Sequence, residues 1–236
     1  MMSYRYLLFD LDGTLLPMDM DNFMNKYMEA LARRLQHFIP PKKFIKYLLA
    51  ATQAMIEDNN LERTNEEVFM EYFFSKTGLE EKDILPVFDE FYDKDFPNLK
   101  RYTKPTSLAQ EIVKKASNLG YELVIATNPV FPRCAIKERM RWAGLDNINF
   151  RLITTYEDMH FCKPSTDYYN EILNILDVSP EACLMIGNDV DEDLVASKVG
   201  INTYLVEDFL LNRNNSEIKS NHRGSLKDFL SFLNEI

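Results

Sequence analysis

The sequence is short of cysteine, histidine and glycine. Its 236 residues include 3 cysteines, 3 histidines and 7 glycines. The cysteines, at positions 134, 162 and 183, form no CxxC pair, so a zinc site is not expected. An odd set of unpaired cysteines is typical of a protein whose thiols stay reduced, which predicts a cytoplasmic location.

Long apolar runs and an excess of positive charge are also missing. A membrane-spanning helix needs roughly 18 consecutive apolar residues, and no such run occurs. The first residues lack the apolar stretch and small-residue cleavage site of a secretion signal. A formal net charge of -10 argues against a broad surface for nucleic acid or anionic membranes. We therefore expect any phosphate group to be bound locally.

From about Pro105 onward, short apolar runs alternate with segments of helical spacing. This alternation predicts a parallel sheet with helices on both faces, a Rossmann-like α/β fold. Tyr4 to Phe9 would join it as a central strand, and Asn212 to Arg223 is interpreted as a polar loop. The expected strands are 121–126, 151–154, 183–186 and 202–206, and the expected helices are 108–119, 135–143, 168–176, 194–199 and 226–233.

Between residues 17 and 103 the alternation gives way to helical periodicity alone. Four amphipathic helices are expected, near residues 23–38, 44–55, 68–74 and 84–91. We interpret 17–103 as a helical cap domain inserted into an α/β core formed by 1–16 and 104–236. The methionines at 18, 20, 24 and 28 are interpreted as core packing.

Two carboxylates end the first apolar run. In "YRYLLFDLDGTLL", residues 4–16, Asp10 and Asp12 follow a segment apolar enough to be buried, where an unpaired charge is costly. Side chains two apart on a strand point the same way, and ligands of parallel sheets bind beyond the carboxyl ends of the strands. An Asp-Gly turn would explain Asp12 but not Asp10.

A second acidic cluster follows a later apolar run, in "MIGNDVDEDLVASKVG", residues 185–200. If a helix begins near Val190, Asp189 lies at its N-terminus and Asp193 one turn later on the same side. Capping of that helix by Asn188 or Asp189 is the alternative explanation. Two acidic sheet ends would repel each other without a cation between them, and oxygen ligands suit Mg²⁺.

Two further segments supply groups for an anionic substrate. Thr127 and Asn128 follow a strand, and Lys163 precedes Pro164. The order of these elements resembles the haloacid dehalogenase superfamily of phosphohydrolases. Its four signatures match "DLDGTL", Thr127, Lys163 and "GNDVDED" in this chain.

The resemblance implies a role for each matched residue. Asp10 would be the nucleophile that forms an aspartyl phosphate, and Asp12 the general acid and base. Mg²⁺ would be held by Asp10, the backbone carbonyl of Asp12 and Asp189. The phosphoryl oxygens would be held by Thr127, Lys163 and backbone amides near Gly13, with Asn128 as a further donor. Asp193 would orient Lys163 or support the metal's waters.

One position departs from the family pattern. Asn188 stands where the family often has an acid, so either Asp189, or Asn188 with Asp193, completes the metal site; we favour Asp189.

The resulting hypothesis is a Mg²⁺-dependent phosphatase of a small phosphorylated metabolite. A phosphomutase and a non-catalytic phospholigand- or protein-binding member are the alternatives. Asp12 favours phosphate chemistry over dehalogenation, which has no leaving alcohol to protonate. Arg33, Arg34 and Arg133 are candidate substrate contacts, although solvated arginines are the commoner case.

Overall fold

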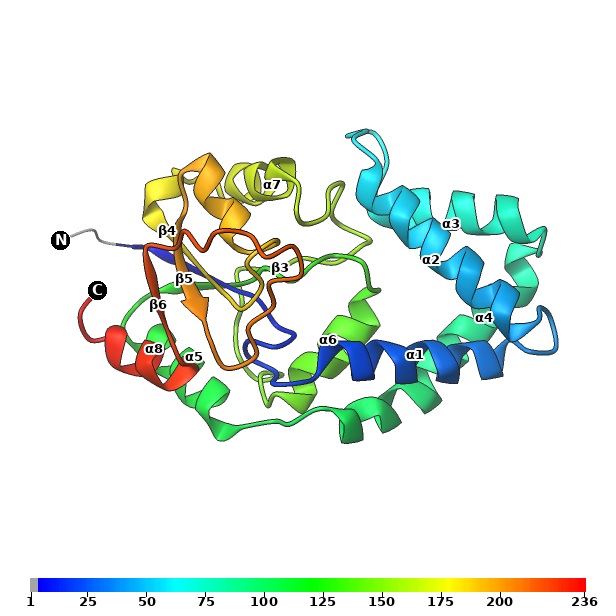
Figure 1. Ribbon diagram of the computed structural model, residues 1–236, viewed down its shortest axis with the longest axis horizontal. Coiled ribbons are helices and arrows are strands. Elements are labelled where there is room, and N and C mark those ends of the chain that lie inside the picture. The colour runs from blue at the N-terminus through cyan, green and yellow to red at the C-terminus, as the bar shows by residue number, and fades with distance from the viewer. Residues whose placement is uncertain (1–3) are drawn as a thin grey trace.

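The computed structural model describes residues 4–236, which form a six-stranded, fully parallel sheet beside a group of helices (Figure 1). The sheet order is β3-β2-β1-β4-β5-β6, so β1 is central, as predicted. The predicted α/β fold is confirmed. The strands are β1 (Tyr6–Phe9), β2 (Glu122–Ile125), β3 (Leu152–Ile153), β4 (Cys183–Gly187), β5 (Asn202–Val206) and β6 (His222–Gly224).

Helices cover both faces of the sheet because its strand residues are apolar on both faces. Leu7 and Phe9 pack toward one face, where the rings of Phe9 and Phe229 lie edge to face with 5.8 Å between their centroids. Tyr6 and Leu8 pack toward the opposite face. The first face carries α5 (Ser107–Asn118) and α8 (Leu226–Phe232), and the second carries α7 (Thr166–Leu176) and the 3-10 helix Leu194–Val199. A short 3-10 helix, Pro180–Ala182, precedes β4.

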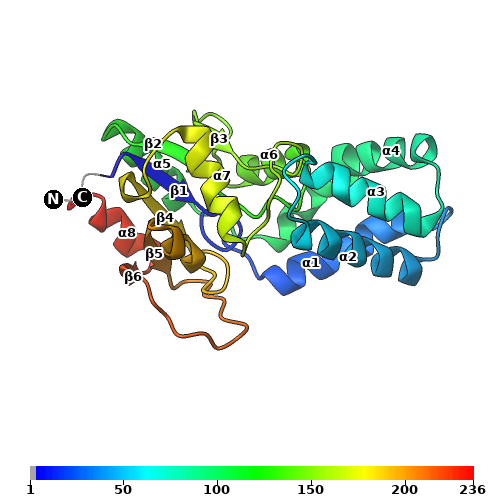
Figure 2. The same ribbon diagram turned by 90° about the horizontal axis from the view of Figure 1, so that it is seen from above.

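Residues 20–102, which we call the helical segment, contain no strand and lie to one side of the sheet (Figures 1 and 2). Its aromatic core includes Phe23, Phe73, Phe91 and Phe96, all fully buried. Within residues 4–236, no helix is both long and apolar enough to cross a membrane. The helical segment consists of α1 (Met20–Arg34), α2 (Pro41–Glu57), α3 (Asn65–Thr77), α4 (Glu81–Glu90), the π-helix Phe91–Asp95 and the 3-10 helix Phe96–Tyr102.

The helical segment contacts the rest of the molecule at several places, among them its two ends, the start of α3, and the rings of Phe23 and Phe96 against Trp142. Its two ends lie together, because Met18 and Thr103 form an antiparallel bridge. At the start of α3, the Asn65 backbone N–H donates to the Met159 carbonyl at 2.8 Å, and the Asn65 side-chain amide donates to the Phe161 carbonyl at 3.3 Å. Helix α6 (Arg133–Trp142) lies between the sheet and α1 (Figure 1).

Two local expectations were wrong. Part of the expected loop 212–223 belongs to β6, which pairs with β5 at Tyr204 and His222; this polar strand gives no hydrophobic signal. The helix expected at 194–199 is present as the 3-10 helix Leu194–Val199, but it does not extend back to Val190, so Asp193 does not lie one turn into a helix. Residues 190–193 form a turn instead, because the Asp189 side chain accepts the backbone N–H groups of Asp191 and Glu192.

Candidate active site

The predicted site residues follow the carboxyl ends of three neighbouring strands, except Lys163, which lies in the loop between β3 and α7. Phe9 of β1 pairs with Ile125 of β2 and Ile186 of β4, so the chain beyond these residues emerges at the same edge. A cavity of about 140 Å³ opens there. Its polar and charged lining residues are Asp10, Asp12, Thr127, Asn128, Asn188, Asp189, Glu192, Asp193 and Arg213. The register of the sheet thus brings together residues from distant parts of the chain.

Lys163 is fully buried beside two of these carboxylates. Its Nζ lies 3.0 Å from Asp10 Oδ1 and 2.6 Å from Asp193 Oδ1. Burial alone would lower the pKa of Lys163, but Asp10 and Asp193 outweigh it and hold that pKa well above the ordinary value. Burial raises the pKa of Asp193 to about 6, against the effect of Lys163. Lys163 is therefore a fixed positive charge next to Asp10.

Asp12 pairs with a buried arginine that the sequence analysis missed. Arg139 of α6 is fully buried, and its Nη1 lies 2.5 Å from Asp12 Oδ2. Burial raises the pKa of Asp12, and Arg139 opposes that shift. The other oxygen, Asp12 Oδ1, has no hydrogen-bond partner within residues 4–236. The sequence did contain one indication of this pair: Arg139 falls on the apolar face of a helix, with Ile136 and Met140.

Asp189 has a cationic partner as well. Its Oδ2 lies 2.6 Å from Nη1 of Arg213, whose side chain is half-exposed. Its Oδ1 accepts the backbone N–H of Asp191 at 2.9 Å. Arg213 was missed because it lies in a polar stretch without periodicity, where nothing local indicates a distant partner.

Two asparagines of the predicted site are held by hydrogen bonds within the protein. Asn188 Oδ1 lies 2.9 Å from the Thr14 hydroxyl, and its Nδ2 donates to the Phe209 carbonyl at 2.6 Å. Asn128 Oδ1 accepts the backbone N–H of Lys163 at 3.2 Å, and its Nδ2 also lies within hydrogen-bonding distance of Glu192 and the Lys163 carbonyl. Asn128 therefore anchors the backbone of Lys163.

Gly13 and Thr127 complete the matched set. Gly13 has a φ of 90°, and a Cβ at this position would lie 2.5 Å from Asn188 Nδ2, so a side chain would collide with the site. Thr127 is buried at the cavity wall, and its backbone carbonyl accepts from the Thr154 and Tyr168 hydroxyls at 2.7 and 2.9 Å. These hydroxyls fix the end of β2.

Contrary to the expectation from the sequence, the two acidic sheet ends do not need a metal cation to stay together. The four aspartates of the site have protein cations as partners. Within residues 4–236, no group of three or more His, Cys, Asp or Glu side chains is arranged to hold a metal ion. The pairs are Asp10 and Asp193 with Lys163, Asp12 with Arg139, and Asp189 with Arg213.

The arginines considered as cap contacts lie elsewhere. Arg34 forms ion pairs with Glu90 and Asp95, and Arg133 pairs with Asp158. Arg33 lines a different surface hollow, formed by α1 and the end of the helical segment. None of the three lines the cavity that contains Asp10.

The haloacid dehalogenase-like hydrolase family model matches residues 7–206, so the chain belongs to this family of hydrolases. Among curated proteins it is similar to haloacid dehalogenase-like hydrolase domain-containing protein 3 of Xenopus laevis, with 25% identity over 134 residues. The match covers 56% of this chain and 53% of that relative, so the chain spans about half of the relative's length.

Solved structures share the fold over nearly the whole chain. A HAD phosphatase from Thermococcus onnurineus matches with a TM-score of 0.59 and 16% identity, covering 97% of both chains. L-2-haloacid dehalogenase from Xanthobacter autotrophicus matches with a TM-score of 0.59 and 13% identity over 99% of both chains. The putative HAD-hydrolase YfnB from Bacillus subtilis, bound to magnesium, has a TM-score of 0.54 and 25% identity, covering 98% of this chain and 99% of that one.

Proposed function

We propose that the protein is a cytoplasmic, Mg²⁺-dependent phosphatase that hydrolyses a small phosphomonoester through an aspartyl-phosphate intermediate. The observation that carries the proposal is the pairing of Asp10 with the buried Lys163 ammonium at 3.0 Å, with Asp12 lining the same cavity. A nucleophilic carboxylate beside a fixed cation suits attack on an anionic phosphoryl group. A second carboxyl group serves proton transfer.

In the first step, an Asp10 oxygen bonds to phosphorus while the bond from phosphorus to the leaving oxygen breaks. The Asp12 carboxyl group gives its proton to that oxygen, releasing an alcohol. The Asp12 carboxylate then takes a proton from water, whose oxygen attacks phosphorus and releases inorganic phosphate and the Asp10 carboxylate. The Oδ1 atom of Asp12 is buried and has no hydrogen-bond partner within residues 4–236, because Arg139 holds only the other oxygen; this supports the role in proton transfer.

The phosphoryl group would be bound by residues around the cavity. The Lys163 ammonium, the Thr127 hydroxyl and backbone amides near Gly13 would stabilise the charge that spreads over its oxygens in the transition state. Asp193 and Asn128 would act as positioning residues, since Asp193 contacts the Lys163 ammonium and Asn128 anchors the Lys163 backbone. The ammonium thus points at Asp10 before substrate arrives.

The residues around the cavity fit a hard cation such as Mg²⁺. Asp10, Asp12 and Asp189 all line it, and no histidine or cysteine does so among the described residues. The Asp10 and Asp189 carboxylates and the Asp12 backbone carbonyl would hold the ion. We favour Asp189 over Asn188 because a carboxylate brings a negative charge to the cation, whereas the neutral Asn188 side chain is held by Thr14 and Phe209. The ion would have to compete with Arg213 and the Asp191 backbone N–H for the two Asp189 oxygens. When bound, Mg²⁺ supplies positive charge that neutralises a phosphoryl oxygen.

We also propose that residues 17–103 form a cap domain on a catalytic core of 1–16 and 104–236. Met20 and Met24 of α1 line the cavity together with Asp10, so the helical segment covers the site from one side. Such a cover would exclude water from the aspartyl phosphate until the alcohol has left.

Phosphate release from acetyl phosphate and 4-nitrophenyl phosphate tests the proposal. We expect turnover with Mg²⁺, its loss on chelation, and a loss of about a thousandfold or more in Asp10→Asn. Asp146→Asn, which changes an exposed acid outside the site, is the matched control. Metal-independent turnover or an active Asp10→Asn protein would contradict the mechanism.

The same preparation distinguishes the other activities. Isomers formed from a sugar phosphate without phosphate release would indicate a phosphomutase. Chloride released from 2-chloropropionate would indicate a dehalogenase. Binding of phosphorylated ligands without turnover of any substrate would indicate a non-catalytic member.

A further inference from the structure

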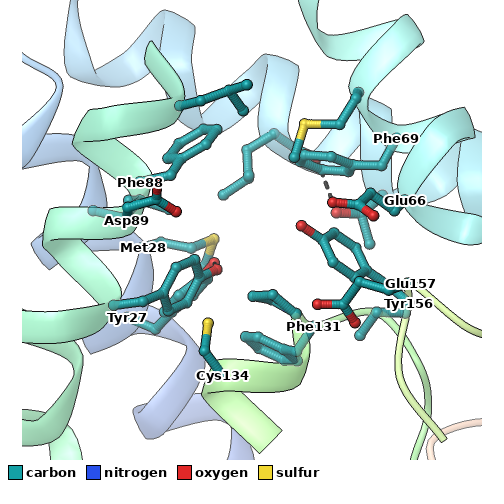
Figure 3. A pocket seen from close by; sticks show the side chains of 18 of the residues that line it. Tyr27, Met28, Glu66, Phe69, Phe88, Asp89, Phe131, Cys134, Tyr156 and Glu157 are labelled. Carbon is teal, nitrogen blue, oxygen red and sulfur yellow. Dashed lines mark hydrogen bonds between the residues drawn. The ribbon is translucent and has the colours of Figure 1, made fainter. Parts of the chain in front are cut away.

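A second and larger cavity adjoins the first. Its volume is about 240 Å³, and Met24, Val130 and Phe131 line both cavities. We call it the chamber. Helices α1 to α4 form most of its wall, and Tyr92 of the π-helix, residues 130–132, Cys134 and residues 156–157 complete it (Figure 3). Nothing in the phosphatase mechanism uses this space.

Phe131 connects the chamber to the proposed proton donor. The Arg139 guanidinium lies over the Phe131 ring, with 4.3 Å between its Cζ and the ring centroid, and the same guanidinium pairs with Asp12. A leaving oxygen beside Asp12 would therefore have its carbon substituent directed past Phe131 and Met24. The chamber is the adjoining space that can receive that substituent.

The wall of the chamber is mainly apolar and aromatic. Figure 3 shows rings of α1, α3 and α4 facing the space from different sides. An engineered apolar cavity of about 150 Å³ binds benzene, so the chamber has room for a ring with a substituent. The aromatic side chains of the wall are Tyr27, Phe69, Phe88, Tyr92, Phe131 and Tyr156.

All charged side chains in this wall are acidic. They are Glu66, Asp89 and Glu157, and no lysine, arginine or histidine lines the chamber within residues 4–236. Glu157 accepts the backbone N–H of Arg133 at 2.8 Å, at the start of α6. Glu66 and Asp89 have no ion-pair partner among the described residues. Carboxylates and ring faces without a basic group attract ammonium groups and repel anions.

We infer that the chamber binds the alcohol portion of the substrate, and that this alcohol has an aromatic or alkyl body and a far end that is uncharged or carries an amine. Alcohols that carry a carboxylate or a second phosphate are disfavoured, because they would bring a negative charge next to Glu66 and Asp89. The inference rests on the proposed phosphatase function and adds its substrate class.

Three para-substituted phenyl phosphates test the inference, carrying a methyl, an aminomethyl or a carboxymethyl group. The methylene insulates the leaving oxygen from the substituent, so the three differ mainly in the charge placed in the chamber. We expect kcat/KM for the methyl and aminomethyl esters to exceed that of the carboxymethyl ester by about tenfold or more. Acetyl phosphate, which is too small to reach the chamber, reports the phosphatase chemistry separately.

The variants Glu66→Gln and Asp89→Asn assign the preference to the chamber. Each should lower the ratio of aminomethyl to carboxymethyl kcat/KM by about threefold or more, since each removes one repelling charge. Asp83→Asn is the matched control: Asp83 is an exposed acid on α4, like Asp89, but lines neither cavity. It should leave the ratio unchanged.

The outcomes separate the two proposals. Equal kcat/KM for the three esters, or a preference for the carboxymethyl ester, overturns the inference while acetyl phosphate hydrolysis still supports the phosphatase. If no substrate is hydrolysed, including acetyl phosphate, the phosphatase proposal fails and the inference is decided by binding. Calorimetric Kd values of the three esters for Asp10→Asn should then follow the same order; no binding, or the reverse order, overturns it.

Discussion

The two adjoining cavities share three side chains yet are built in opposite ways. At the carboxyl ends of the strands, Asp10, Asp189 and Asp193 are buried and Asp12 is largely buried, and each has a cationic partner. In the chamber, apolar and aromatic side chains set the shape, and Glu66 and Asp89 have no cationic partner among the described residues. Buried charges must be paired, so the first cavity tolerates few substitutions. An apolar wall depends mainly on side-chain volume, so the second cavity should tolerate single substitutions of similar volume better than the first.

Lys163→Met should have the largest effect, because it leaves two buried carboxylates without their cation. We expect a loss of about 3–5 kcal/mol in the free energy of unfolding, measured by urea titration, and about a hundredfold to a thousandfold lower kcat. Lys198→Met, at an exposed site without an ion pair among the described residues, should change neither. A stable, active Lys163→Met protein would show that the buried carboxylates at the sheet do not depend on a cationic partner.

Phe73→Ala should lower stability to a similar extent by a different cause. Phe73 is fully buried against Phe44, Phe69 and Phe88, so truncation opens a cavity in the helical segment. We expect a loss of about 3–5 kcal/mol by thermal or urea unfolding. Phe38→Ala, at a half-exposed position, provides the control. A loss as small as that of the control would mean that the segment is not held by its aromatic core.

The Asp12 and Arg139 pair can be tested with a double-mutant cycle. Arg139→Met should cost about 3 kcal/mol, because Asp12 stays buried without a cation. Adding Asp12→Asn should recover part of that loss, since the unpaired charge is then removed. Urea unfolding of the two single variants and the double variant gives the coupling. Strictly additive losses would mean that the two side chains do not stabilise each other.

Asn65→Ala should have the smallest of these effects. The side chain is buried, and its amide joins α3 to the Phe161 carbonyl. We expect a loss of about 1–3 kcal/mol, from unfolding curves. The exposed Asn59→Ala is the control. An unchanged unfolding free energy would show that this contact does not hold the helical segment in place.

Features that depend on a local sequence pattern could be predicted, whereas contacts between distant segments could not. The apolar runs that became β1, β2, β4 and β5 were visible as patterns, and the family signatures drew attention to Asp10 and Lys163. The partners Arg139 and Arg213 were not predicted, because pairing across distant segments is decided by how α6 and the chain after β5 pack. Strand β6 was missed for a related reason: backbone hydrogen bonds to β5 hold it, not an apolar side-chain pattern.

The antiparallel bridge between Met18 and Thr103 has a practical consequence for engineering. The polypeptide leaves and re-enters the α/β portion at facing residues, so a foreign module with closely spaced ends could be spliced in there. Such a replacement would exchange the residues of α1 to α4 that line the chamber and would leave Asp10 and the strands of the sheet unchanged. If the helical segment selects the substrate, as we propose, recombination at these two junctions should change which substrates are hydrolysed.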